Sequence, residues 1–412
     1  MSFPRYRDYR PSGVAWLGDI PAHWNVERGR NLFSQLTIPP EIDDRVVTAF
    51  RDGQVTLRDN RRTDGFTLAV LEVGYQRVRK GDLVIHGMDA FAGAIGVSES
   101  TGKCTPEYSV LTPLRDGIDN HYFSNLLRVM AGRNYIFVIC PSVRERAPRF
   151  RFEAFKDVTL SVPPHAEQRK ISVFIDHEIA KINGLVAEQQ RLIDLLNEQV
   201  SSLILSSFDQ EETYELRLSE ASEIISRPVA QKTDETYTRI GLFNRGRGLF
   251  HKAASEMDDM GESDFFWVEA GDLIISGQFA WEGAVALAGN EDADCVVSHR
   301  YPVIRGKCGV ALTEYLFGLL CTKHGNFLLN ENSRGAAGRN RPLNISSLMK
   351  EVVPIPSMAI QERVARAVHA RNALLREIAR AIDLLHERRT ALISAAVTGQ
   401  IDVRHLAPLP AA

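Results

Sequence analysis

The sequence predicts an α+β protein built as an internal repeat, in which two similar mixed α/β domains are each followed by one long helix. Blocks of sequence recur in the same order along the 412 residues. Each copy opens with about 150 residues rich in short strand patterns and closes with an apolar stripe at helical spacing. This length, with 44% hydrophobic and 25% charged residues, suits two or three globular domains.

The repeat is clearest in a Gly-Asp-Leu strand. Val78–Ile85 and Val268–Ile275 match at an offset of 190 residues, and at that offset Trp24–Arg28 lies over Tyr214–Leu218. At an offset of 193, further matches follow in the same order: Tyr108–Leu111 over Tyr301–Ile304, Val162-Pro163 over Ile355-Pro356, and Gln168 over Gln361. The alternative is coincidence among residues that are common in strands and turns.

Each copy has the same predicted layout. A turn leads into the Gly-Asp-Leu strand, Gly-rich turns follow it (AFAGAIG and WEGAVALAG), and a last strand ends at a proline. We therefore expect globular domains over residues 1–164 and 208–357, with helical regions over residues 165–207 and 358–412, the latter including a tail.

Two segments, at roughly 165–205 and 358–397, carry apolar residues three and four positions apart and contain no proline. A helix of that length spans about 60 Å, more than one small domain can cover. We expect the two helices to pack on each other as a coiled coil, whereas the alternative is that each folds back on its own domain. The stripe residues are Ile171, Phe174, Ile175, Ile179, Ile182, Val186, Ile193, Leu196, Val200 and Leu203, then Val364, Val368, Leu375, Ile378, Ile382, Leu385, Leu392 and Ala396.

Motifs for catalysis are missing from the sequence. The string nearest to a phosphate-binding loop, Gly96–Cys104, is one residue too long and ends in Cys. No Lys has an acidic residue two positions before it, as a common nuclease motif requires, and neither Pro-Pro pair fits an adenine methyltransferase motif. His177-Glu178 starts a zinc-protease pattern that fails at Lys181. We therefore predict a chain that is not an enzyme and binds no metal.

Arginines gather in segments that look like loops, although the net charge of −3 counts mildly against nucleic-acid binding. Two Arg-rich runs take equivalent places, with Arg146 over Arg339 at the 193 offset. Arginine suits phosphates and guanine edges, and Asn340 could add a contact to adenine. The alternative is a solvated charged surface. The candidate DNA-binding residues are Arg61, Arg62, Arg144, Arg146, Arg149, Arg151, Arg245, Arg247, Arg334, Arg339, Asn340 and Arg341.

The five cysteines form no C-x-x-C pair, so we expect reduced core residues in the cytoplasm. The N-terminus has no apolar stretch typical of a signal peptide, and no run approaches the ~18 apolar residues of a membrane span.

The chain also resembles a known family, the specificity subunits of type I restriction–modification systems. The resemblance begins with Ser12–Trp24 (SGVAWLGDIPAHW) and continues through both Gly-Asp-Leu strands. It includes the Pro-x-x-x-x-Gln segments from Pro163 and Pro356, and it ends with Ala396–Val403 (AVTGQIDV). One departure is Ile360, where the first copy has Glu167.

This resemblance implies two target-recognition domains joined by two long helices packed as an antiparallel coiled coil. Each domain would read one half of an asymmetric, bipartite double-stranded DNA target. The helices would dock methyltransferase (modification) subunits, in two copies, and a motor and endonuclease (restriction) subunit would join them. S-adenosylmethionine, ATP and Mg would be bound by those partners and not by this chain, and no membrane would be involved. Other readings are a coiled-coil scaffold without a sequence-specific DNA role and a free-standing DNA-modifying enzyme.

Overall fold

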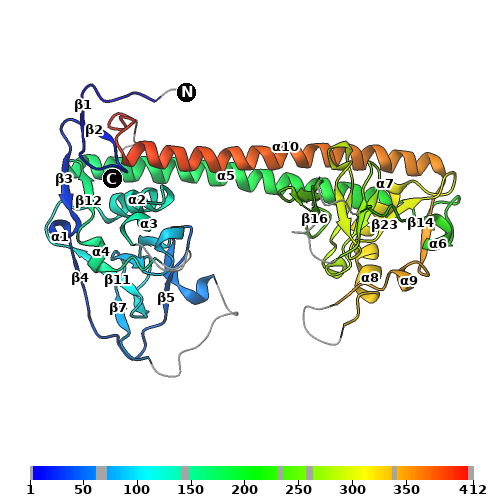
Figure 1. Cartoon of the computed structure of the whole chain (residues 1–412), viewed down its shortest axis with the longest axis horizontal. Coiled ribbons are helices and arrows are strands. Elements are labelled where there is room, and N and C mark those ends of the chain that lie inside the picture. The colour runs from blue at the N-terminus through cyan, green and yellow to red at the C-terminus, as the bar shows by residue number, and fades with distance from the viewer. Residues whose placement is uncertain are drawn as a thin grey trace. The chain divides into compact units, whose positions relative to one another are not determined.

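The structure is a computed structural model that describes residues 3–61, 72–140, 148–230, 235–256, 263–335 and 341–406. Contacts divide the chain into two compact units (Figure 1). Unit 1 comprises Met1–Leu185 and Leu384–Ala412, and unit 2 comprises Val186–Asp383. The long helices α5 (His165–Leu205) and α10 (Met358–Val397) each contribute residues to both units.

Unit 1 is built mainly from short strands before α5. Its strands are β1 (Tyr9–Pro11), β2 (Asp19–Pro21), β3 (Asn25–Arg28), β4 (Phe33–Gln35), β5 (Val47–Ala49), β6 (Val55–Leu57), β7 (Gln76–Val78), β8 (Leu83–His86), β9 (Ile95–Val97), β10 (Gly102–Cys104), β11 (Tyr108–Pro113) and β12 (Thr159–Val162). Its shorter helices are α1 (Gly29–Leu32), α2 (Asn120–Gly132), α3 (Tyr135–Ile139) and α4 (Phe152–Phe155), with 3-10 turns η1 (Arg58–Asn60) and η2 (Ala90–Ala92).

Unit 2 has a closely similar succession of elements. Its strands are β13 (Tyr214–Arg217), β14 (Ser222–Ile225), β15 (Thr236–Tyr237), β16 (Ile240–Leu242), β17 (Leu249–His251), β18 (Ser255–Glu256), β19 (Phe265–Trp267), β20 (Leu273–Ile275), β21 (Val285–Leu287), β22 (Val296–Ser298), β23 (Val303–Gly306) and β24 (Val352–Ile355). Its shorter helices are α6 (Leu218–Ala221), α7 (Thr313–Cys321), α8 (Lys323–Glu331) and α9 (Ile345–Leu348), with 3-10 turns η4 (Ala280–Glu282) and η5 (Asn290–Asp292).

A four-stranded antiparallel sheet lies in each unit. Its strand order is β4-β11-β8-β9 in unit 1 and β14-β23-β20-β21 in unit 2. Leu111 pairs with Leu83 in the first sheet, and Ile304 pairs with Leu273 in the second. These pairs lie at the 193 and 190 offsets that the sequence blocks indicate, so the same strands carry the matched residues.

One predicted match is wrong by a single residue. The sequence blocks place Trp24 over Tyr214, but Asn25 pairs with Val162 and Tyr214 pairs with Ile355. Because Val162 and Ile355 occupy equivalent places in the repeat, their pairing partners Asn25 and Tyr214 are also equivalent. The offset between the copies is therefore 189 residues in these strands. A slip of one residue in a strand turns every side chain to the opposite face, so the correction changes which residues correspond in β3 and β13.

The start of each long helix is held by one buried glutamine. The Gln168 amide donates to the carbonyls of Pro163 (2.8 Å) and Gly117 (3.2 Å), and its oxygen accepts from the Asp119 amide (2.9 Å). Gln361 makes the same set with Pro356 (2.9 Å), Val310 (3.1 Å) and Leu312 (2.8 Å). Each partner of Gln168 lies 193 residues before the corresponding partner of Gln361, so the repeat extends to individual hydrogen bonds.

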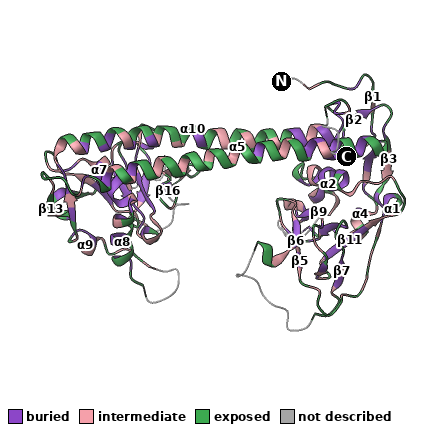
Figure 2. Cartoon of the chain, turned by 180° about the vertical axis from the view of Figure 1, so that it is seen from behind, coloured by how far each residue is buried: buried purple, intermediate pink, exposed green. Residues whose placement is uncertain are grey.

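The predicted apolar stripes of α5 and α10 are buried or half-buried at every position, while many of the remaining residues of both helices are exposed (Figure 2). In unit 1, Ile171 and Ile175 near the start of α5 share a core with Leu392 and Ala396 near the end of α10. In unit 2, Val200 and Ile204 near the end of α5 share a core with Val364 and Val368 near the start of α10. Within each unit the two helices therefore contribute opposite ends to one core.

The cysteines agree with the sequence expectation except at one position. All five are free, and Cys104 and Cys295 are buried, but Cys308 is exposed and is not a core residue. No described helix is both long and apolar enough to cross a membrane.

Candidate nucleic-acid interface

Each unit presents a short hairpin whose loop we name the tip: tip 1 is residues 50–54, between β5 and β6, and tip 2 is residues 243–248, between β16 and β17. Tip 1 closes with hydrogen bonds from the Phe50 amide to the Gln54 carbonyl (2.8 Å) and from the Gly53 amide to the Phe50 carbonyl (2.9 Å). Tip 2 closes with a bond from the Phe243 amide to the Gly248 carbonyl (3.0 Å). Phe50 and Phe243 lie 193 residues apart, so the tips are equivalent elements of the repeat.

The predicted Gly-rich turns support these tips. In both units the turn is a 3-10 turn that ends at a left-handed glycine, Gly93 (φ 93°) or Gly283 (φ 69°). In unit 2 the Gly246 amide donates to the Gly283 carbonyl (2.9 Å). In unit 1 a Cβ on Gly93 would lie 2.6 Å from the Arg51 carbonyl oxygen. Glycine allows both the left-handed backbone and this close approach, so the turn fixes the position of the tip.

An arginine stacks on the phenylalanine of each tip. The Arg61 guanidinium carbon lies 4.3 Å from the centre of the Phe50 ring, and that of Arg247 lies 5.4 Å from the Phe243 ring. Arg61 also pairs with Asp52 (2.7 Å), whereas Arg247 donates to the Asn244 carbonyl (3.0 Å). Stacking holds the guanidinium plane while leaving donors free, which suits contacts to phosphates or base edges.

Exposed aromatic residues accompany the arginines in unit 2. Phe243 and Phe250 are both exposed, and their ring centres lie 4.9 Å apart. Arg341 stacks over Trp281, at 5.1 Å from the ring centre. Aromatic faces next to arginines are a common means of contacting nucleic acid. Arg61, Arg245, Arg247 and Arg341 therefore lie on or beside surfaces with suitable chemistry.

Other predicted residues are not part of the tips and form ion pairs of their own. Arg149 and Arg151 both pair with Glu107, at 3.8 and 2.9 Å, and Arg334 pairs with Glu331 in its own segment. These ion pairs partly neutralise the positive charge of the three predicted DNA-binding arginines. Arg62, Arg144, Arg146, Arg339 and Asn340 lie outside the described residues, so their role stays a prediction.

Each of the two Arg-rich runs is followed by a short helix and not directly by the last strand of its domain. The short helix α4 follows Arg151 before β12, and α9 follows Arg341 before β24.

The sequence interpretation missed Phe50 and Arg51 in tip 1 and Phe243 and Trp281 in unit 2. Arg51 pairs with Asp89 at the Gly-rich turn (2.9 Å). Extending the 193 offset to FRDG and FNRG would have aligned both tips, so the signal was present in the repeat.

A half-buried histidine, His86, supports the turn in unit 1. The Nδ1 of His86 accepts a hydrogen bond from the Asp89 amide (3.0 Å), and its ring centre lies 4.5 Å from that of Tyr108. Burial lowers the pKa of His86, and the negative charge of Asp89 partly opposes this shift. The neutral ring therefore accepts the bond that shapes the turn beneath tip 1.

Among the residues that the structure describes, no three His, Cys, Asp or Glu side chains gather where they could hold a metal ion. The tips offer donors, aromatic faces and positive charge, which are the properties of a binding surface.

Comparison with known proteins gives a likeness in fold. No family model matches the chain, and no curated protein matches it. A solved chain from work on complex assembly and conformational transition of the type I R-M system is 15% identical with a TM-score of 0.51, and the match covers 92% of this chain and 98% of that one. This likeness shows a shared fold along nearly the whole of both chains.

Two further solved structures are similar but have lower TM-scores. The HsdS subunit from Thermoanaerobacter tengcongensis is 14% identical with a TM-score of 0.44, and the match covers 93% of this chain and 98% of that chain. The type I restriction-modification system S subunit from M. genitalium is 16% identical with a TM-score of 0.47, and the match covers 90% of this chain and 96% of that chain.

Proposed function

We propose that this chain is the sequence-specific DNA-binding subunit of a type I restriction–modification complex. Each target-recognition domain reads one half of a bipartite DNA target and directs adenine methylation and restriction by partner subunits. The observation that carries the proposal is the fold shared with a chain of a type I system over 92% of this chain. The N- and C-terminal sequence motifs of the specificity subunits support it independently.

The target is asymmetric on this proposal. The tips share a phenylalanine, a stacked arginine and a glycine turn, but their remaining residues differ: tip 1 reads Phe-Arg-Asp-Gly-Gln and tip 2 reads Phe-Asn-Arg-Gly-Arg-Gly. Base readout depends on which donors and acceptors reach the groove. Two readers with different side chains therefore select two different half-sites.

The long helices form an antiparallel coiled coil that sets the gap between the half-sites. Support comes from the two cores, in which opposite ends of α5 and α10 meet. A fixed spacing between two readers fixes the spacing of the sequences they bind.

The same helices dock the methyltransferase subunits. Leucines outside the buried stripes remain exposed: Leu192 (40%) and Leu195 (53%) on α5 and Leu374 (46%) on α10 in unit 2, with Leu185 (50%) and Leu384 (64%) in unit 1. Exposed apolar side chains that recur along a helix are typical of a surface that binds another protein. The internal repeat offers two similar surfaces, one for each of two partner copies.

The chain itself is non-catalytic and binds no cofactor or metal. S-adenosylmethionine, ATP and Mg are bound by the methyltransferase and restriction partners, and the complex works on DNA in the cytoplasm. This division of labour agrees with the missing catalytic motifs in the sequence.

Selection from a random duplex library tests the proposal. The full chain, purified with its methyltransferase partner, is expected to enrich two different short motifs separated by a gap of fixed length. Capture of the partner without any sequence enrichment would favour a scaffold. Enrichment of a single palindrome would contradict two different readers.

A further inference from the structure

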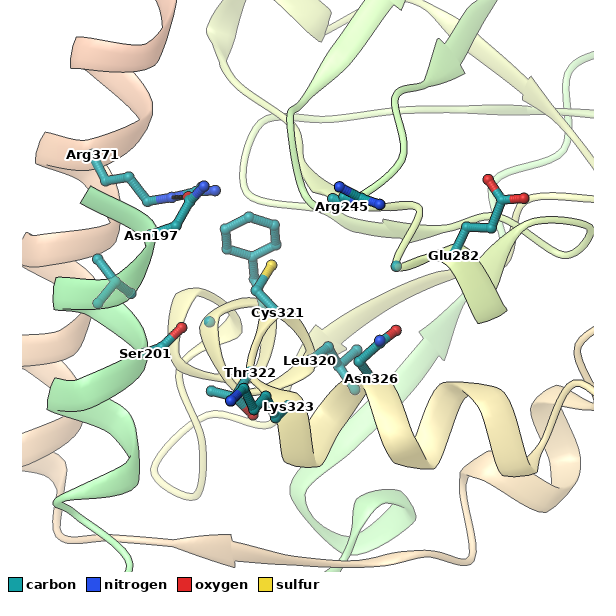
Figure 3. A pocket seen from close by; sticks show the side chains of 14 residues that line it. Asn197, Ser201, Arg245, Glu282, Leu320, Cys321, Thr322, Lys323, Asn326 and Arg371 are labelled. Atoms are coloured by element: carbon teal, nitrogen blue, oxygen red, sulfur yellow. Dashed lines mark hydrogen bonds between the residues drawn. The ribbon is translucent and has the colours of Figure 1, made fainter. Parts of the chain in front are cut away.

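A cavity of about 290 Å³ lies beneath tip 2 in unit 2 (Figure 3). Arg371 reaches it from α10, Arg245 from the tip, and Lys323 from the first turn of α8. Asn197 and Asn326 add neutral polar groups, and apolar side chains such as Phe317 form much of the rest of the lining. Three cationic side chains therefore line a cavity that is otherwise largely apolar.

Arg371 is only 4% exposed, yet all its hydrogen-bond partners are neutral. Its guanidinium donates to the Oδ1 atoms of Asn197 (2.8 Å) and Asn372 (2.7 Å) and to the Gly246 carbonyl (3.1 Å). Burial lowers the pKa of Arg371, but a guanidinium stays charged in proteins. A buried charge that no opposite charge balances costs free energy, and a bound anion would remove that cost.

The neighbouring charges do not supply this anion. Within the described part of the chain, no carboxylate forms an ion pair with Arg371, Arg245 or Lys323. Glu282 also lines the cavity and brings one negative charge to it, and its carboxylate accepts a hydrogen bond from Asn244. The three cationic side chains outnumber this carboxylate, so the cavity keeps an excess of positive charge.

Unit 1 has a similar arrangement beneath tip 1. The Arg128 guanidinium on α2 lies so near Gly53 that a Cβ there would be 2.5 Å from it. The Nε of Arg128 is buried and has no hydrogen-bond partner in the described chain. Burial lowers the pKa of Arg128, as does the positive charge of Arg389 on α10. The nearby Asp52 carboxylate acts in the opposite direction, but it pairs with Arg61.

The two units reach this arrangement with different residues. Gly53 and Gly246 are equivalent at the 193 offset, as are Arg128 and Cys321. The Cys321 sulfur occupies the place of the Arg128 guanidinium, 2.6 Å from where a Cβ on Gly246 would lie. Unit 2 has Cys321 of α7 where unit 1 has Arg128 of α2, and it places Arg371 of α10 beneath the tip instead. Similar chemistry at equivalent places, built from non-equivalent residues, points to a shared ligand.

We propose that each unit binds one DNA backbone phosphate between its tip and α10, on Arg128 and Arg389 in unit 1 and on Arg371 and Arg245 in unit 2. This inference rests on the proposed function and deepens it. A phosphate contact fixes the register of the protein on the duplex without reading sequence. The paired arginines anchor the strand while the tips contact the bases.

The test measures DNA binding by the full chain with its methyltransferase partner over a range of salt concentrations. Arg128→Gln, Arg389→Gln, Arg371→Gln and Arg245→Gln are compared with the control variants Arg388→Gln and Arg366→Gln on α10. Each anchor variant is expected to raise the Kd about tenfold for the target duplex and for an unrelated duplex alike. It also lowers the slope of log Kd against log salt by about 0.9. The controls leave both quantities unchanged.

The outcomes separate this inference from the proposed function. If the wild-type chain binds its target but Arg389→Gln and Arg245→Gln leave the salt slope unchanged, the phosphate anchors are wrong and the proposed function stands. If the wild-type complex binds no DNA, both the phosphate anchors and the proposed function are wrong. These two variants do not alter the buried Arg371, so they test the proposal even if Arg371→Gln does not fold.

A second arm distinguishes DNA phosphate from free phosphate. Inorganic phosphate is added at constant ionic strength while the melting temperatures of the wild type and Arg371→Gln are measured. Stabilisation of the wild type alone, together with unchanged DNA slopes, would assign the cavity to free phosphate and overturn the DNA anchor.

Discussion

Replacing Gln168 or Gln361 by Leu is expected to destabilise the two units to the same extent. Each glutamine makes three hydrogen bonds to main-chain groups, and the two sets are equivalent. At about 1 kcal/mol net for each bond, the free energy of unfolding falls by about 3 kcal/mol. The main-chain groups that lose their partner stay buried, which adds to this loss.

Calorimetry of the full chain measures the effect. For units of this size, about 3 kcal/mol lowers the melting temperature by roughly 6–12 °C. Gln168→Leu should shift the transition of unit 1, and Gln361→Leu that of unit 2. Gln199→Leu, at an exposed position of α5, is the control. A loss below about 1 kcal/mol, or losses that differ by more than about 1.5 kcal/mol between the units, would refute the equivalence.

Three further predictions concern readout, pH and assembly. Arg61→Gln and Arg247→Gln should each weaken base selection at one half-site in the library experiment, because each stacked guanidinium presents donors beside its own tip. The expected loss of discrimination is about 1–3 kcal/mol. A loss at both half-sites, or at neither, would contradict this assignment. Because burial lowers the pKa of His86, the folded chain binds its proton less readily than the unfolded chain. The free energy of unfolding of unit 1 should therefore fall as pH drops below about 6.5, and urea titrations of His86→Phe should lack this part of the decline. Leu192→Glu should reduce co-purification of the methyltransferase, whereas Ser202→Glu, also exposed on α5, should not; equal recovery would argue against docking there.

The long helices could be predicted closely from the sequence. The predicted segments, 165–205 and 358–397, match α5 and α10, because an apolar period sustained over about 40 residues without proline is a strong local signal. The Gly-Asp-Leu strands and the glycine turns were also predicted, since they depend on residues that are adjacent in sequence.

The tips could not be predicted in the same way. Tip 2 is positioned by contacts with Glu282 and Gly283, which lie far from it in sequence. A short loop has no periodicity, and its support is tertiary. The positions of Arg128 and Arg371 beneath the tips likewise follow from tertiary packing. Nothing in their local sequence distinguishes them from surface arginines.

The structure gives a reason for the one difference noted between the starts of the two long helices, Glu167 in the first copy and Ile360 in the second. Its buried carboxylate accepts hydrogen bonds from Tyr6 and from the Trp24 ring nitrogen (3.0 Å), and it pairs with His23 (2.9 Å). These partners belong to the N-terminal segment of unit 1. Ile360, in the equivalent place of unit 2, has no such charged network.

The most direct test of the proposed function is to co-express the chain with a candidate methyltransferase partner and to map methylated adenines across the host DNA. If this chain selects the target, an asymmetric, bipartite methylation motif with a fixed gap appears, and it disappears when this chain is omitted. Methylation of the same sites without this chain would contradict its role as the subunit that selects the target.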